Sequence, residues 1–146
     1  MKHWLLYLWN LYPPFFGSGI RITHVEPDFS VIRVSLRLRW WNANIIGTLF
    51  GGSIYMMCDP FHMVMLIKLL GTKYLVRDKG AEVRFLKKGE NGAYVQFEID
   101  PRTIAEIWDC EDGVQERQFL ALVRNDEGEV IAEVRKFMHI RRLAND

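Results

Sequence analysis

The most apolar stretch of the chain runs from Asn42 to Leu70 and reads NANIIGTLFGGSIYMMCDPFHMVMLIKLL. After the pair Gly51-Gly52, apolar residues cover every face of a helix instead of one stripe. The pattern therefore predicts one long helix that begins at the glycines and is buried in the core. Asp59 lies in the middle of this helix. Because a buried carboxylate costs on the order of several kcal/mol unless it is compensated, we expect Asp59 to have a partner or a chemical role.

The segments on both sides of this helix alternate between apolar and polar residues with a period of two, which is typical of half-buried strands. The clearest case is 31–40, where three arginines share one face. That face could bind phosphate, although a solvated face is the simpler interpretation. The dipeptide Asn91-Gly92 predicts a hairpin turn, and 101–112 carries a weak helical pattern. Strand patterns occupy residues 19–25, 31–40, 74–89, 93–100, 117–125 and 129–143.

One helix followed by a run of antiparallel strands predicts an α+β fold. We expect a curved antiparallel sheet of about five or six strands, wrapped round the long central helix. The segment 74–89 reads as a strand with a Lys-Gly interruption. The sequence contains neither an internal repeat nor a linker, so residues 1–146 are expected to form a single domain.

Residues 2–12 are rich in aromatic side chains and begin with positive charge. The apolar run is short, Asn10 interrupts it, and no small-residue cleavage site precedes Pro13-Pro14, so we do not expect a signal peptide. A membrane-surface anchor would need a basic polar face, which this stretch lacks. We therefore expect a short N-terminal helix that packs on the domain and ends at the prolines, and no membrane partner.

The charges nearly balance, with 19 Lys and Arg against 18 Asp and Glu, so no strong field attracts nucleic acid or an anionic membrane. The two cysteines are too few for a disulfide framework. Cys58 lies in the apolar helix, which indicates a reduced thiol and a cytoplasmic protein. Neither Cys58 nor Cys110 has zinc-ligand spacing, so no metal site is expected.

The start of the helix and its central carboxylate are the candidate chemical groups. The first amides of a helix carry partial positive charge, and glycines at Gly51-Gly52 let a ligand approach, so they could hold a developing oxyanion. Tight packing against a strand explains the glycines equally well. Asp59 follows Gly52 by about two turns and lies on roughly the same side. Two structural roles compete for Asp59: a helix cap created by Pro60, and a pair with His62 three residues later.

The pattern Asn-x-x-Gly-x-x-Phe-Gly-Gly over residues 44–52, followed after six residues by Asp59, resembles the signature of hotdog-fold acyl-CoA thioesterases of the phenylacetate-pathway type. The wider string resembles a largely uncharacterised bacterial subgroup of that superfamily. The resemblance covers nearly the whole chain. Its matching pieces are residues 10–15, 19–22, 39–60 and 78–89.

This resemblance implies a hotdog fold whose two subunits join their sheets in a homodimer, with a dimer of dimers (homotetramer) left open. Active sites then lie at the subunit interface, with an acyl-CoA as substrate and no cofactor. Asp59 would be the nucleophile, or the general base that activates water against the thioester. The amide of Gly51 or Gly52 from the other subunit would polarise the carbonyl. Asn44 would position substrate or water, and Lys79 would contact the ligand.

The chain departs from this family at Phe50, because members commonly carry His directly before the two glycines. Phe50 would then contact the substrate without hydrogen bonding to the thioester. Two functions follow: hydrolysis of an acyl-CoA or acyl-carrier thioester at Asp59, or binding of an acyl or lipid ligand without catalysis. The related hotdog dehydratases need a catalytic His paired with an acidic residue, and the sequence contains no such motif.

The methionines of the central helix suit an adaptable apolar pocket and motivate the binding hypothesis, although ordinary core filling is the simpler explanation. A third alternative is an oligomeric structural domain without a small-molecule site. The polar turn at Asn42 and Asn44 argues against it, because polar groups beside a buried carboxylate are costly unless satisfied. The methionines in question are Met56, Met57, Met63 and Met65.

Overall fold

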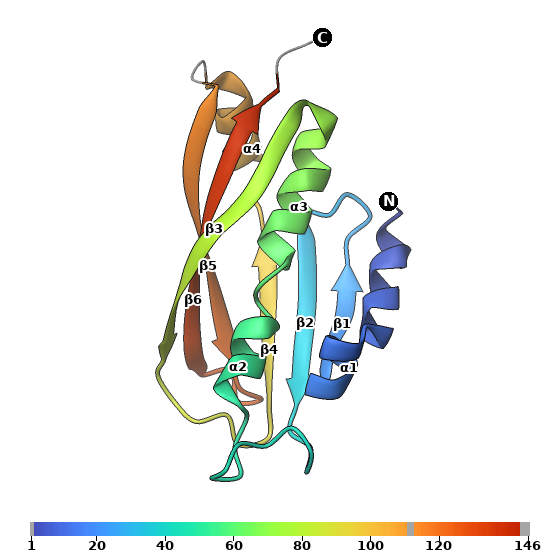
Figure 1. Cartoon of the computed structure of the whole chain (residues 1–146), viewed down its shortest axis with the longest axis vertical. Coiled ribbons are helices and arrows are strands. Elements are labelled where there is room, and N and C mark those ends of the chain that lie inside the picture. Colours follow the sequence, from blue (N-terminus) through green and yellow to red (C-terminus); the bar gives the residue numbers. More distant parts are fainter. Residues whose placement is uncertain (1, 111–112, 144–146) are drawn as a thin grey trace.

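The structure, a computed structural model, describes residues 2–110 and 113–143. Six antiparallel strands form one sheet in the order β1-β2-β4-β5-β6-β3. The sheet curves behind the helices α2 and α3, and the N-terminal helices lie beside β1 (Figure 1). The elements are η1 His3–Leu11, α1 Pro13–Ser18, β1 Ile20–Val25, β2 Val31–Arg37, α2 Gly51–Met56, α3 Phe61–Leu70, η2 Gly71–Lys73, β3 Tyr74–Phe85, β4 Gly92–Glu98, α4 Pro101–Asp109, β5 Val114–Arg124 and β6 Val130–Arg142.

The strand β2 confirms the period-two prediction. Ile32, Val34 and Leu36 are fully buried against the core, and the residues between them face outward. Arg33 on the outer face donates a hydrogen bond of 2.7 Å to Gln96 of β4. The arginine face is therefore crossed by a side chain of the neighbouring strand. The strand ends at Arg37, before the end predicted from the alternation.

The N-terminal segment forms the predicted short helix, η1, which ends before the prolines, but a second helix that was not predicted, α1, begins at Pro13. The segment is attached to the edge strand β1. The side chain of Asn10 accepts a hydrogen bond of 2.7 Å from the amide of Ile22 and donates one of 3.2 Å to its carbonyl. The hydroxyl of Tyr7 accepts a bond of 3.1 Å from the amide of Val25, and Leu6 is completely buried. These contacts occupy the free edge of β1, which would otherwise present unpaired backbone groups.

The central helical segment Gly51–Lys73 packs on the sheet, and its ladder of hydrogen bonds is interrupted at residues 57–60. The amides of Cys58 and Asp59 bond three residues back instead of four, and Pro60 has no amide to donate. The helix that was predicted as one long element is therefore broken into α2 and α3. By length and composition the segment is apolar enough to cross a membrane, but half of its most apolar window is buried inside the molecule.

The predicted interruption of β3 is a β-bulge. Asp78 pairs with Met138 of β6 and Gly80 pairs with Phe137, so that Lys79 is the extra residue. The bulge leaves Asp78 on the inner face and turns Lys79 outward, where it pairs with Glu116. The helix predicted at 101–112 is present as α4, Pro101–Asp109; residues 111–112 lie outside the described residues.

Candidate active site

The break between α2 and α3 places the carboxylate of Asp59 at the surface of the helical segment. Its Oδ1 atom accepts hydrogen bonds of 2.7 Å from the hydroxyl of Tyr55, one turn earlier, and of 2.7 Å from the ammonium of Lys136. No hydrogen bond from the described residues reaches Oδ2, and 48% of the side chain is exposed. One oxygen of the carboxylate is thus fixed while the other remains available.

The partner, Lys136, comes from the inner face of β6, and only 1% of its side chain is exposed. Its ammonium also contacts the carboxylate of Asp78 on the neighbouring strand β3 and lies 3.4 Å from the hydroxyl of Tyr55. An ammonium has three protons to donate, and these three oxygens lie around it. Two carboxylates therefore compensate the burial of one cation.

These contacts keep both members of the pair charged. Burial acts to raise the pKa of Asp59, but the hydrogen bonds from Lys136 and Tyr55 together outweigh it, and the pKa lies below its usual value. Burial likewise acts to lower the pKa of Lys136, and the contacts with Asp59 and Asp78 reverse this, so that its pKa is raised. Burial and the bond to Asp59 raise the pKa of Tyr55, which therefore donates as a neutral hydroxyl.

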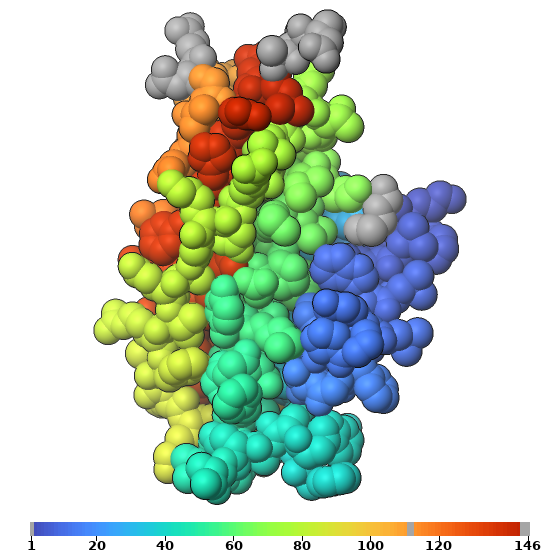
Figure 2. Space-filling view, viewed as in Figure 1, coloured from blue at the N-terminus to red at the C-terminus, as the bar shows by residue number. Residues whose placement is uncertain are grey.

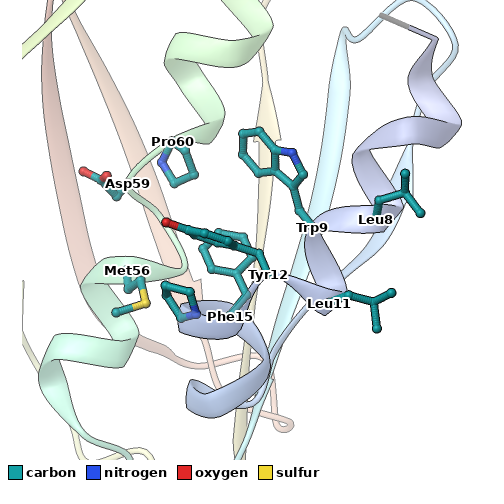
Figure 3. Close-up of a pocket in the computed structure, with 9 residues that line it drawn as sticks. Leu8, Trp9, Leu11, Tyr12, Phe15, Met56, Asp59 and Pro60 are labelled. Atoms are coloured by element: carbon teal, nitrogen blue, oxygen red, sulfur yellow. The ribbon is translucent and has the colours of Figure 1, made fainter.

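A pocket of about 800 Å³ lies between this break and the N-terminal segment. Figure 2 shows the N-terminal segment and the central helical segment side by side on one face of the molecule. In Figure 3, Tyr12 points its hydroxyl toward Asp59 from across the pocket. Asp59 is the one charged side chain among the nine lining residues, so the pocket is apolar with a single anion at its wall. The lining residues are Leu8, Trp9, Leu11, Tyr12, Pro14, Phe15, Met56, Asp59 and Pro60.

The predicted helix-start residues lie elsewhere in the chain's own structure. Asn44 and Gly51 line a second hollow of about 360 Å³, and Asp59 is not among the residues that line it. Gly52 precedes Asp59 by seven residues, which corresponds to about 10 Å along a helix. A single chain therefore leaves the glycine amides and the carboxylate apart.

The glycines at the start of α2 allow two aromatic rings to approach closely. A Cβ on Gly52 would overlap the ring of Phe50, and a Cβ on Gly51 would lie 3.0 Å from the ring of Phe85. Both rings are more than half exposed, at 55% for Phe50 and 57% for Phe85. The close contacts with Phe50 and Phe85 therefore support the explanation that the glycines are needed for packing, which the sequence had left open.

The amide of Asn44 is used within its own loop. Its oxygen accepts from the amides of Ile46 and Thr48, and its nitrogen donates to the Thr48 hydroxyl and the Leu49 carbonyl. Both donor protons are therefore occupied in shaping the loop before α2. Lys79 is half exposed and pairs with Glu116 on the outer face, whereas its neighbour Asp78 contacts Lys136.

Two structural alternatives for Asp59 prove wrong. The residue that caps α3 is Pro60, and the first turn of α3 receives no side-chain cap. His62 faces away from Asp59 and packs between Phe97 and Phe119, with ring centroids 5.1 and 5.2 Å away. Burial, and to a lesser extent the charge of Lys136, lowers the pKa of His62 to about 4.

Cys58 is buried and free, as expected, and burial raises the pKa of its thiol well above the usual range. No group of three or more His, Cys, Asp or Glu side chains in residues 2–110 and 113–143 is arranged to hold a metal ion.

Sequence reasoning missed Lys136, although the alternation of β6 contained a signal. A lysine in the apolar phase of a clean strand pattern points into the core and needs compensation there. Tyr55 and Asp78 carry no comparable signal, because their role depends on Lys136. The inner positions of β6 that share the phase of Lys136 and are buried are Ala132, Val134, Met138 and Ile140.

The comparison with known families decides the affiliation of the chain. Residues 3–140 match the family described as Domain of unknown function (DUF4442). The chain belongs to the DUF4442 family. No curated protein matches this DUF4442 chain.

Solved structures similar to this DUF4442 protein include several thioesterases. A protein of unknown function from Pseudomonas aeruginosa, described as a probable thioesterase, is 20% identical with a TM-score of 0.82, over 97% of each chain. A thioesterase from Haemophilus influenzae is 13% identical with a TM-score of 0.72, over 99% of this chain and 94% of the other. A Staphylococcus aureus thioesterase mutant is 15% identical with a TM-score of 0.65, over 88% and 98%. At these identities the likeness establishes the fold, and the predicted hotdog fold is confirmed.

Proposed function

We propose that this protein is a thioesterase that hydrolyses an acyl-CoA at Asp59. The observation that carries the proposal is the state of this carboxylate. Oδ1 is held by Lys136 and Tyr55, Oδ2 accepts no hydrogen bond from residues 2–110 and 113–143, and the group lies at the wall of a large apolar pocket. The fold shared with thioesterases of low sequence identity supports the same reaction class.

The lowered pKa of Asp59 bears on its chemical role. A lowered pKa favours the ionised carboxylate, which a nucleophile and a general base both require. Because Oδ2 accepts no hydrogen bond from the described residues, we propose that this atom adds to the thioester carbonyl. The new C–O bond would form as the C–S bond breaks, the thiolate would leave and take a proton from solvent, and water would then hydrolyse the mixed anhydride to the free acid and regenerate Asp59.

A homodimer is part of this proposal. In the sheet order, β1 and β3 are the edge strands. The outer edge of β1 is occupied by Asn10. Within the described chain β3 pairs only with β6, so its other edge is open to a second chain. Two chains could join at β3 and bring the start of α2 of one subunit toward Asp59 of the other. The oxyanion role of Gly51 or Gly52 and the ligand contacts of Phe50 and Lys79 remain predictions that need such a dimer.

A thiol-release assay with a panel of acyl-CoA thioesters tests the enzyme, with the wild type and Asp59→Asn measured side by side. The neutral amide keeps the shape of the carboxylate but loses its charge, so we expect turnover to fall by about 10²- to 10⁴-fold. The melting temperature of the variant shows whether the fold is retained. Turnover that is equal in the wild type and in a folded Asp59→Asn variant would contradict the assignment.

Binding of an acyl ligand without catalysis is the second candidate, and the position of Phe50 favours it. Its ring lies over Gly52 at the start of α2, where the carbonyl of a substrate would have to approach the amides. This function predicts that the protein purifies with an acyl ligand, visible by native mass spectrometry, and is silent across the thioester panel. A ligand-free protein that hydrolyses thioesters would exclude it.

A further inference from the structure

The N-terminal segment supplies most of the wall of the pocket that reaches Asp59. Six of the nine lining residues lie between Leu8 and Phe15, and the remaining three are the last residue of α2, Met56, and two residues of the break, Asp59 and Pro60. Apart from Asp59, the polar side-chain groups among these nine are the hydroxyl of Tyr12 and the indole N–H of Trp9. The pocket volume of about 800 Å³ falls within the roughly 300–1,000 Å³ typical of small-molecule sites.

This wall is attached to the body of the domain. Asn10 bonds both backbone groups of Ile22 on β1, and it lies between lining residues on either side of it in the chain. Phe15 is 4% exposed, and its ring contacts those of Trp9, Tyr12 and Phe61 at centroid distances of 6.2, 5.9 and 6.0 Å. A wall fixed in this way forms the pocket before a ligand arrives, which reduces the ordering cost of binding.

From this arrangement we infer that the pocket is the acyl site of the proposed thioesterase and that the N-terminal segment selects uncharged, apolar acyl groups. The inference rests on the proposed function and adds the substrate class. An acyl group that ends in a carboxylate would be repelled by Asp59 and would find no cation among the lining residues. It would therefore lose its hydration without compensation. An apolar chain instead gains about fourfold in affinity for each buried methylene.

The chain offers a matched pair of variants for the test. Leu8 and Leu11 line the pocket and are 55% and 72% exposed, and both side chains point away from Asp59 in Figure 3. Changing both residues to serine therefore removes part of the apolar wall without altering the contacts of the carboxylate. Trp4 belongs to the same segment, is 52% exposed and is not among the lining residues, and Trp4→Ser is the control. Thermal melting of each variant checks that the fold is retained.

The measurement is calorimetric binding of non-hydrolysable thioether analogues of acyl-CoA, from acetyl to decanoyl, to the full-length protein. In the wild type we expect affinity to rise by about fourfold per methylene until the pocket is filled. The ratio of decanoyl to acetyl affinity should fall at least tenfold in Leu8→Ser/Leu11→Ser and remain unchanged in Trp4→Ser. A ratio that is unchanged in the double variant, or that falls equally in the control, would overturn the inference.

The outcome separates the two proposals. Chain-length-dependent binding together with no hydrolysis of the natural thioesters would remove the enzyme and leave the acyl site. Hydrolysis that depends on Asp59 but ignores chain length would leave the enzyme and remove the acyl site.

Discussion

The ammonium of Lys136 lies 2.7 Å from Oδ1 of Asp59, and the two side chains differ sharply in burial, at 1% and 48% exposed. The cation is anchored in the core by β6 and by a second carboxylate, Asp78, whereas Asp59 lies in the break between the helices and lines the pocket. Because the buried partner is the fixed one, Lys136 sets the position and the charge of the carboxylate.

Replacing Lys136 tests this dependence. Lys136→Met keeps an unbranched apolar stem in the core but removes the charge, so the pKa of Asp59 should rise and the acid limb of kcat/KM should move to higher pH. We expect kcat to fall by about 10- to 100-fold from loss of positioning, and stability to fall by about 1–3 kcal/mol because Asp78 loses its partner. The measurements are the pH profile and urea unfolding.

The control for this variant is Lys87→Met, which removes a half-exposed lysine paired with Glu129. Exposed ion pairs contribute roughly 0–1 kcal/mol, so its activity, pH profile and stability should stay close to those of the wild type. An acid limb in the same place for Lys136→Met and the wild type would show that Lys136 does not control Asp59.

The second carboxylate, Asp78, should act through Lys136. In Asp78→Asn the amide oxygen can still accept from the ammonium, so we expect kcat to fall only a few-fold and stability to fall by about 1–2 kcal/mol. Combined with Lys136→Met, the change at Asp78 should cost less than it does alone, because its partner is already absent. A double-mutant cycle of unfolding free energies measures this coupling, and strictly additive effects would contradict it.

The alternation of residues predicted the sheet well because each strand buries one face. In β2 the apolar positions 32, 34 and 36 are all fully buried. The exact ends of elements were harder to predict, since they depend on tertiary contacts: β2 stops at Arg37, and the central helix breaks where Pro60 lacks an amide.

The site could be predicted only in part. Asp59 was visible because a carboxylate inside an apolar run has to be compensated. Its partner Lys136 is 77 residues away in the chain, and the meeting of the two depends on how β6 lies against the helix, which no local pattern specifies. The pair with His62 failed for the same reason: His62 follows Asp59 by only three residues but lies in α3, where it packs against Phe97 and Phe119 in the core.

His62 should give the protein an acid sensitivity that is separate from the site. Its folded-state pKa is lowered from 6.5 to about 4, so between these values the unfolded chain binds a proton that the native chain does not. Stability from the neutral histidine is therefore present above pH 6.5 and lost as the pH falls toward 4, by up to about 3 kcal/mol. His62→Leu removes this titration, and the difference between wild-type and variant unfolding free energies should follow that pH window. Parallel curves for the two proteins would show that His62 is not the group that titrates.

Gly52 and Phe50 offer a direct separation of packing from catalysis at the start of α2. A Cβ on Gly52 would overlap the ring of Phe50, so that this half-exposed ring has to shift, and Gly52→Ala should destabilise the protein by up to about 1 kcal/mol. Adding Phe50→Ala removes the obstructing ring and should recover most of that loss in urea unfolding. Additive destabilisation in the double variant would show that the ring is not the obstacle.

Thiol release by the same two variants then distinguishes the roles of the glycine. A methyl group at Gly52 would also stand in the way of a carbonyl that approaches the helix amides from the partner subunit. If Gly52 serves the substrate, Gly52→Ala/Phe50→Ala should be stable and still lack turnover, while Phe50→Ala alone remains active. If Gly52 serves only the packing of Phe50, turnover should return together with stability, and the oxyanion would have to be held by another group.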